Sequence, residues 1–161
     1  MKDTNPYTRW QLYAMTALRV IIGWHFLYEG LAKLMKPGWS AAGFLLQSKW
    51  LMAPLFKWIA GNPALLSIVN QLNIWGLIAI GLGLMVGCMT RIASLAGIGL
   101  ILLYYICNPP FIGLYYSLPS EGNYLFVNKN VVEMAALFVI FKFRTSHILG
   151  FDRFIALWRK K

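Results

Sequence analysis

Four apolar stretches, each approaching the length of a membrane-spanning helix, constrain what this chain can fold into. At a rise of 1.5 Å per residue, a hydrocarbon core of about 30 Å requires roughly 20 residues. The stretches cover residues 10–34, 71–88, 92–107 and 131–143. Only 12% of the residues are charged and the mean hydropathy is +0.60, whereas about 25% of the residues of a soluble domain are charged. The sequence therefore predicts an all-α membrane protein, a four-transmembrane-helix bundle that forms a single domain over residues 1–161.

The basic residues predict how this bundle is oriented. Four spans place both termini on one side, and the nine Lys and Arg residues of that side are Lys2, Arg9, Arg91, Lys142, Arg144, Arg153, Arg159, Lys160 and Lys161. The other side has five, which are Lys33, Lys36, Lys49, Lys57 and Lys129. Because cytoplasmic loops are richer in Lys and Arg, both termini are expected in the cytoplasm. The first stretch lacks a small-residue cleavage signature, so we interpret it as a retained span.

The net charge of +10 would also suit a nucleic-acid-binding protein. However, the basic residues flank apolar runs rather than forming an aromatic-laced polar face, so the partner expected is the lipid bilayer and not nucleic acid. The tail over 144–161 ends in "RFIALWRKK" and predicts a basic amphipathic helix at the anionic cytoplasmic leaflet.

Two outer connections are more than linkers. Residues 37–70 mix Trp50 and Trp58 with Lys49 and Lys57, a composition typical of an interfacial or re-entrant segment. Pro54 would break a helix there. Residues 108–130 contain three prolines and three tyrosines, and predict a lid over the helix ends.

Glycines in the second stretch predict where helices touch. Gly76, Gly83 and Gly87 are spaced by seven and four residues, so they share one helix face, and the last two form a GxxxG motif. The first interpretation is packing inside the bundle. The alternative is a homodimer seam.

Ionisable residues inside the first stretch are the main functional signal, because charges within a membrane are costly and usually functional. His25, Glu29 and Lys33 follow one another at i, i+4 and therefore lie on one helix face. Arg19 lies about 15 Å deeper than Glu29 and faces elsewhere, so it needs its own partner, such as carbonyl groups or backbone exposed at glycines.

The last stretch supplies a second acid. "NKNVVEMAALF" places Glu133 at the depth of Glu29, so the two acids are expected to converge beneath the lid with Lys33, Asn128, Lys129 and Asn130. We expect Glu29 to be held by Lys33 and by Lys129 or Asn128. Three interpretations remain open: a structural ion-pair network, a site for a ligand or quinone head group, and a proton relay through His25.

Other chemistries lack their residues. Cys88 and Cys107 lie at opposite ends of their spans and cannot form a disulfide, and no CxxC motif is present, which disfavours a thiol–disulfide enzyme. A single imidazole without a carboxylate cluster predicts no metal site. Any electron chemistry would need a cofactor or partner from elsewhere.

Several motifs in order resemble the DoxX family of small bacterial membrane proteins. They are Arg19, Gly23, "EGLAKL" from Glu29, "GCMTRIASLAG" from Gly87 and "NKNVVEMAALF" from Asn128. The resemblance covers residues 10–143 and implies a four-helix bundle and, through the DoxD-type subunit of thiosulfate:quinone oxidoreductase, a role beside the quinone pool. The polar residues carried over are Arg19, Glu29, Lys33, Arg91, Asn128, Lys129 and Glu133. His25, the Trp-rich outer loop and the basic tail are not parts of this pattern.

Two functions are compatible with these features. One is an accessory, non-catalytic or quinone-binding subunit of an oxidoreductase, which predicts an apolar tunnel from the bilayer to the polar cluster. The alternative is a non-catalytic scaffold or assembly factor for another membrane or envelope protein, which predicts a cluster closed by ion pairs and an exposed aromatic patch. A small-solute transporter is a weaker third interpretation, because four short spans leave little room for an inverted repeat.

Overall fold

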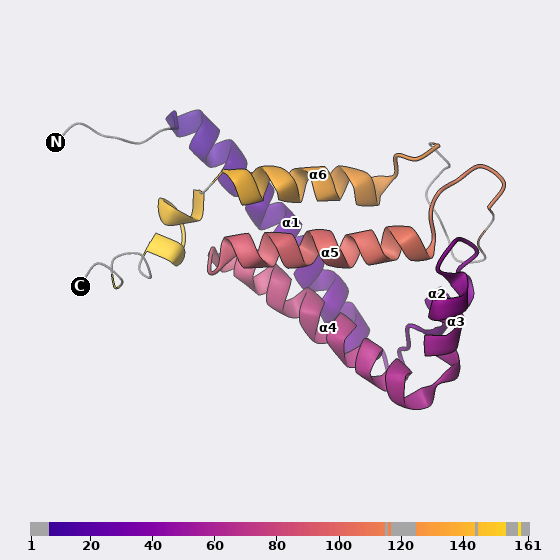
Figure 1. Cartoon of the computed structure of the whole chain (residues 1–161). Coiled ribbons are helices and arrows are strands. Elements are labelled where there is room, and N and C mark those ends of the chain that lie inside the picture. The colour runs from indigo at the N-terminus through magenta and orange to yellow at the C-terminus, as the bar shows by residue number, and fades with distance from the viewer. Residues whose placement is uncertain (1–6, 115, 117–124, 144, 154–157, 159–161) are drawn as a thin grey trace.

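The computed structural model describes residues 7–114, 116, 125–143, 145–153 and 158, and regular structure within them is helical. The helices are α1 (Arg9–Met35), α2 (Ala42–Leu46), α3 (Ala53–Gly61), α4 (Pro63–Val86), α5 (Thr90–Cys107), α6 (Lys129–Lys142) and the 3-10 helix η1 (Thr145–His147). Figure 1 shows α1, α4, α5 and α6 running alternately in opposite directions, with α2 and α3 at the end far from the α4–α5 turn. Each of the four predicted spans coincides with one of these alternating helices.

Local signals in the sequence explain where the helices begin and end. Thr8 forms a capping box with Gln11 at the start of α1, and Asn62 accepts hydrogen bonds from two amides of α4 just before Pro63. Gly87 ends α4 in the left-handed conformation at φ 74°. Asn128 starts α6 by accepting a hydrogen bond from the amide of Val131 at 3.2 Å.

The predicted second span begins too late. α4 starts at Pro63, eight residues before the apolar run, because the Asn62–Pro63 pair caps a helix that the apolar count did not detect. α4 and α5 both have the length and hydropathy of membrane spans. α1 is long enough but includes ionisable residues, and α6 has 14 residues, a length of about 21 Å.

The main core lies where the alternating helices meet. Its buried side chains come from α1, α4, α5 and α6, and they are Ile22, Phe26, Leu77, Ile80, Leu84, Ala93, Ile101, Leu137 and Ile140. Two of them, Leu84 and Leu137, are completely buried. This core holds α1 against α4 and α6 and so fixes which face of α1 points outward.

A second, smaller core explains the outer segment. α2 and α3 pack against the start of α4 and the end of α5 through Ala41, Leu45, Phe56 and Cys107. Pro54 lies in the first turn of α3, so the segment forms two short helices separated by a turn, as Pro54 predicts. The two helices form a wedge, residues 42–61, between the diverging outer ends of α4 and α5 (Figure 1).

The other predicted segments are described in part. The lid over 108–130 includes residues 115 and 117–124, which lie outside the described residues. Of the tail, residues 145–153 form η1 and a turn that docks on the α4–α5 turn, where the amide of Asp152 donates to the carbonyl of Gly87 at 2.9 Å. The amphipathic helix expected over 144–161 stays a prediction, because most of its second half is not described.

Candidate functional site

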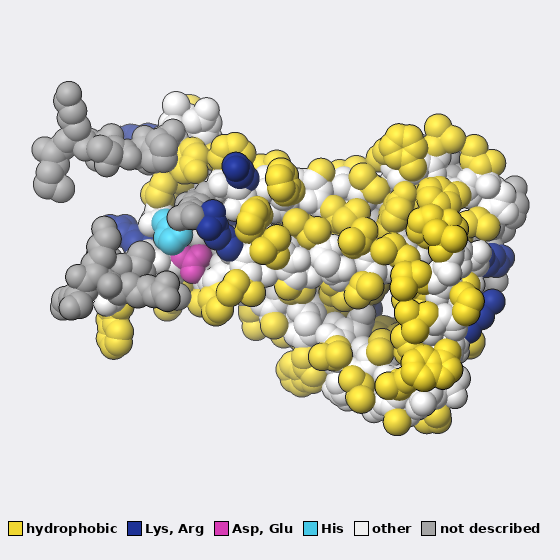
Figure 2. All heavy atoms as spheres, in the orientation of Figure 1, with side chains coloured by type: hydrophobic (Ala, Val, Ile, Leu, Met, Phe, Trp, Pro, Cys, Tyr) yellow, Lys and Arg dark blue, Asp and Glu magenta, His cyan; other side chains and the backbone are white. Residues whose placement is uncertain are grey.

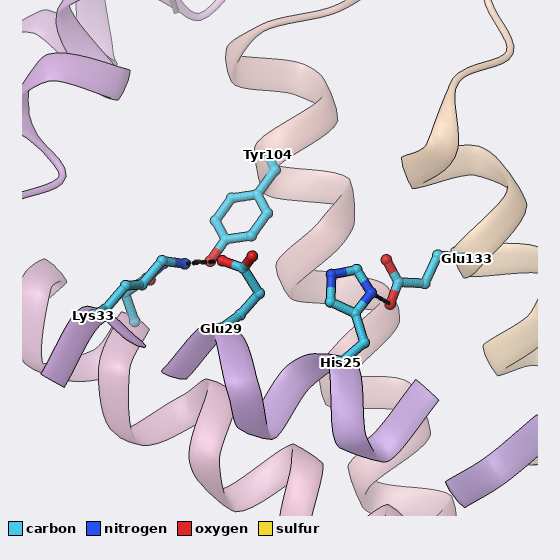
Figure 3. A network of polar contacts seen from close by, with 6 residues as sticks. His25, Glu29, Lys33, Tyr104 and Glu133 are labelled. Atoms are coloured by element: carbon cyan, nitrogen blue, oxygen red, sulfur yellow. Dashed lines mark hydrogen bonds and ion pairs between the residues drawn. The ribbon is translucent and has the colours of Figure 1, made fainter. Parts of the chain in front are cut away.

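One face of α1 presents the polar residues that the sequence singled out. Lys33 Nζ lies 3.6 Å from Glu29 Oε2, and His25 Nδ1 lies 3.1 Å from Glu133 Oε1 of α6. Figure 3 shows the Glu29 carboxylate between Lys33 and His25, as the i, i+4 spacing predicts. The two acids lie on either side of His25 and pair with different residues, and we call His25, Glu29, Lys33, Tyr104 and Glu133 the polar cluster.

The partner of Glu133 differs from the prediction. Glu133 pairs with His25. The sequence predicted that Glu133 lies with Lys33, Asn128, Lys129 and Asn130, and it indicated no acid as the partner of His25. Among the described residues no hydrogen bond joins Asn128 to Glu29, and the Asn128 side chain instead caps α6, with its Oδ1 accepting from the amide of Val131. Lys129 lies near enough to influence His25 electrostatically, and Asn130 follows it in the first turn of α6. The contribution of Lys129 to Glu29 stays a prediction.

Side-chain burial varies along the polar cluster, and we call the part around Lys33 its closed end. The side chains of His25 and Glu29 are 48% and 49% exposed, whereas those of Lys33 and Glu133 are 18% and 16% exposed. The Glu29–Lys33 pair lies within one helix, so it cannot fasten helices together. The His25–Glu133 pair is the ion pair that joins α1 to α6 among the described residues.

Two residues that the sequence analysis missed form the closed end. Tyr104 of α5 accepts a hydrogen bond from Asn73 Nδ2 of α4 at 2.5 Å. The Lys33 ammonium lies over the Tyr104 ring at 5.6 Å and over the Trp39 ring at 5.4 Å, distances typical of cation–π contacts. The sequence signal for Asn73 was a single Asn inside an apolar run. The signal for Tyr104 was weaker, because Tyr104 and Tyr105 are adjacent in "LLYYICN" and the sequence does not indicate which of them points inward.

Arg19 belongs to a different site. Its side chain is buried, with the residue 2% exposed, and Nη2 donates to the carbonyl of Leu149 at 2.7 Å. A Cβ on Gly87 would lie 2.9 Å from Arg19 Nη1. The expected partner, a carbonyl group beside glycine backbone, is therefore confirmed. The polar cluster does not include Arg19.

The same region holds an unpredicted helix cap. Met89 precedes α5 without capping it, and Asp152 instead accepts from the amides of Met89 at 2.7 Å and Thr90 at 3.2 Å. Burial acts to raise the pKa of Asp152, but hydrogen bonds from Ser146, Met89 and Thr90 outweigh it and hold that pKa below its usual value. We call Arg19, Gly87, Leu149 and Asp152 the tail clasp.

The glycine prediction was partly wrong. A Cβ on Gly76 would meet nothing within 4 Å, so Gly76 packs against no other part of the described chain. Gly83 packs on Ala93, while Gly87 serves the tail clasp. The close crossing of α1 and α4 uses Gly23 and Gly81 instead. The homodimer alternative is untested.

A shallow apolar groove of about 460 Å³ lies between α4 and α5, lined by residues that include Gly83, Cys88 and Ala93. It reaches no residue of the polar cluster, so it is not the predicted tunnel. Both cysteines are free, and no three His, Cys, Asp or Glu side chains among the described residues are grouped to hold a metal ion.

Comparison with known proteins identifies the family. The DoxX family model matches residues 14–107, more than half of the chain, from α1 to the end of α5. The motif around Glu133 lies beyond that match. No curated protein and no solved structure matches the chain. The family match and the two apolar helices are sufficient to identify the chain as a membrane protein of the DoxX family.

Proposed function

We propose that α1, α4, α5 and α6 all cross the bacterial inner membrane as one domain, with both termini in the cytoplasm. Figure 2 supports this arrangement, because on the face shown the Lys and Arg side chains gather at the two ends of the molecule with a largely uncharged band between them. In this orientation the α4–α5 turn and the tail clasp face the cytoplasm. The wedge and the outer end of α1 face the opposite side.

The proposed function is an accessory membrane subunit of a quinone-linked redox complex, with the quinone head group at the polar cluster. The carrying observation is the exposure of His25. His25 lies ten residues before the end of α1 at Met35, about 15 Å along the helix, yet its side chain is 48% exposed. A half-exposed imidazole inside a membrane span needs a polar group on its exposed side, because lipid tails offer none.

The residues present fit a quinone. Lys33 and Tyr104 supply hydrogen-bond donors for a ring oxygen, and Glu29 and Glu133 supply acceptors for the hydroxyl groups of the reduced form. A bound quinone would supply two-electron, two-proton redox chemistry. The contribution of this chain is to orient the head group and to hold protons at His25 and the two carboxylates.

A scaffold or assembly factor is the second candidate, and a separate observation favours it. Leu51 and Trp58 of the outer segment are exposed, and Ile112 is exposed in the next connection. These apolar side chains beside Lys49 and Lys57 would suit an envelope or membrane protein partner. In that case the polar cluster would be a structural ion-pair network.

The test is quinone binding to the full chain in lipid discs. Decylubiquinone is titrated while the fluorescence of the tryptophans is followed, since Trp39 lies next to Lys33. We expect saturable binding that is weakened about tenfold in Lys33→Gln, which removes a charge-assisted hydrogen bond to a ring oxygen and leaves at most a neutral one. Lys57→Gln, an exposed lysine of α3, is the matched control and should bind like the wild type. Absence of saturable binding in the wild type would reject the quinone proposal and leave the scaffold.

A further inference from the structure

The wedge presents a surface that neither the polar cluster nor the tail clasp explains. Figure 1 shows α2 and α3 running across the outer ends of α4 and α5 rather than along them. In the membrane arrangement proposed above, the axes of α2 and α3 therefore follow the plane of the membrane at the level where the spans end. A helix in that position meets phospholipid head groups on one side and acyl chains on the other.

The side chains of α3 are distributed in a way that suits this position. Phe56 is buried in the second core, so it marks the side of α3 that faces the protein. Leu55 and Trp58 are exposed and lie on one edge of the helix, because they are three residues apart. Lys57 is exposed and follows Leu55 by two residues, about 200° around the helix. The helix therefore has an apolar edge and a basic edge, with the protein-facing side between them.

The turn between α2 and α3 has the same composition. Leu51 and Met52 are exposed there, and Lys49 is exposed with its ammonium over the Tyr116 ring at 5.7 Å. Figure 2 shows hydrophobic side chains covering this end of the molecule, with Lys or Arg side chains at its outer edge. An exposed apolar surface of this kind marks an interaction site, and acyl chains would cover it without a protein partner.

The charge of the wedge has only one sign. Lys49 and Lys57 are two of the five basic residues expected on the outer side, and the sequence has no Asp or Glu between Glu29 and Glu121. No carboxylate of the wedge can therefore neutralise the two lysines. Basic residues on the outer side also run against the usual bias of membrane proteins. An anionic partner accounts for them, because each lysine near an anionic lipid surface strengthens binding about fivefold.

We propose that the wedge is a docking surface for an anionic phospholipid of the outer leaflet, such as phosphatidylglycerol. Leu51, Leu55 and Trp58 lie among the upper parts of the acyl chains, and the ammonium groups of Lys49 and Lys57 bind head-group phosphates. This inference uses the proposed membrane arrangement but does not depend on the quinone site. It gives the wedge a lipid partner, whereas the scaffold alternative gives the same surface a protein partner.

The experiment places a fluorescent dye on the wedge of the full chain in lipid discs. Leu51→Cys is labelled in a Cys88→Ser background, since Cys107 is buried and is not expected to react. The discs are made of phosphatidylcholine with the same small fraction of brominated phosphatidylglycerol or brominated phosphatidylcholine, whose bromine atoms quench the dye on contact. We expect brominated phosphatidylglycerol to quench about fivefold more strongly. Salt at about 1 M should abolish this difference.

Matched variants identify the groups responsible. Combining Lys49→Gln with Lys57→Gln should lower the ratio of the two quenching constants to about one, because only the attraction to the anionic head group is lost. Quenching by brominated phosphatidylcholine should be unchanged. Ile92→Cys, labelled in the same background, is the control, because Ile92 is exposed near the start of α5 at the other end of the molecule. The ratio measured there should not respond to the loss of the wedge lysines.

The contrary outcomes each overturn the inference. Equal quenching by the two lipids at position 51 with both lysines present would mean that the wedge does not select anionic lipid. Quenching by neither lipid, with normal quenching at position 92, would place the wedge outside the bilayer and favour the protein partner. A preference that survives the loss of both lysines would reject their role. The first two results do not depend on whether the lysine variant folds, and the quinone titration is independent of all three.

Discussion

The crossing of α1 over α4 leads to a sharp prediction for Gly81→Ala. A Cβ on Gly81 would lie 2.7 Å from Leu27 Cα and 2.8 Å from the carbonyl oxygen of Gly23. Both are backbone atoms, so no side-chain rotation relieves the overlap and the two helices must separate. Overpacking of this kind costs about 1–3 kcal/mol, against a gain in helix propensity of at most about 1 kcal/mol. We expect a net loss of about 1–2 kcal/mol in the free energy of unfolding.

The same helix offers the control. Gly76→Ala adds an identical methyl group to α4 where nothing lies within 4 Å, so helix propensity alone acts there and stability should be unchanged or slightly higher. At about 2–4 °C per kcal/mol for a chain of this size, Gly81→Ala should melt about 2–8 °C below Gly76→Ala in mild detergent. Equal melting temperatures for the two variants would refute the close crossing.

Three further changes test the tail clasp and the polar cluster. Asp152→Ala should lower stability by about 1–2 kcal/mol through loss of the α5 cap. Because the pKa of Asp152 is lowered by folding, melting curves should show this difference above about pH 4 and lose it as the pH falls further, and a pH-independent difference would contradict it. Arg19→Met strands the carbonyl of Leu149, so limited trypsin digestion should cut faster at Arg153 than in the wild type; an unchanged rate would argue against the clasp. Glu29→Gln should change the free energy of unfolding by less than about 1 kcal/mol, since Glu29 is half-exposed and pairs with Lys33 within one helix. A loss of about 3–5 kcal/mol would indicate a structural network.

The positions of the helices were largely predictable because membrane helices are encoded locally. Apolar length alone located α1, α5 and α6 to within two residues at each end. It failed at the start of α4, where the first eight residues include Ser67 and Asn70 and pack against the wedge rather than forming an unbroken apolar run. The cap at Asn62 and Pro63 was the better signal there, because it depends on backbone chemistry and not on lipid contact.

The polar cluster was predictable within a helix and unpredictable between helices. The i, i+4 spacing correctly placed His25, Glu29 and Lys33 on one face of α1. Which of them meets Glu133 depends on how α6 is rotated and how far it slides along α1, and the sequence contains no local signal for either. Asn128 illustrates the same limit, because a residue that precedes an apolar run serves first as a helix cap.

Glycine spacing was misleading for a related reason. The GxxxG pattern identifies a small-residue face, but packing requires a partner face. Gly23 of α1 lies opposite Gly81, and Gly76 faces no part of α1. Position 87 requires glycine because its φ is positive and because Arg19 lies too close for a side chain. A rule based on the spacing of glycines predicts neither requirement. The tail clasp joins residues about 130 positions apart, and no periodicity reports such a contact.

The exposure of the ion pairs supports the proposal that the polar cluster binds a ligand. A buried charge is costly unless it is paired or hydrogen-bonded. Arg19 of the tail clasp is a buried charge, since it is 2% exposed and donates to a carbonyl 130 residues away. The polar cluster differs, because Glu29 pairs within its own helix and remains 49% exposed. An exposed pair within one helix contributes little to stability, and under the proposed function the Glu29 carboxylate is available to a polar ligand beside α1.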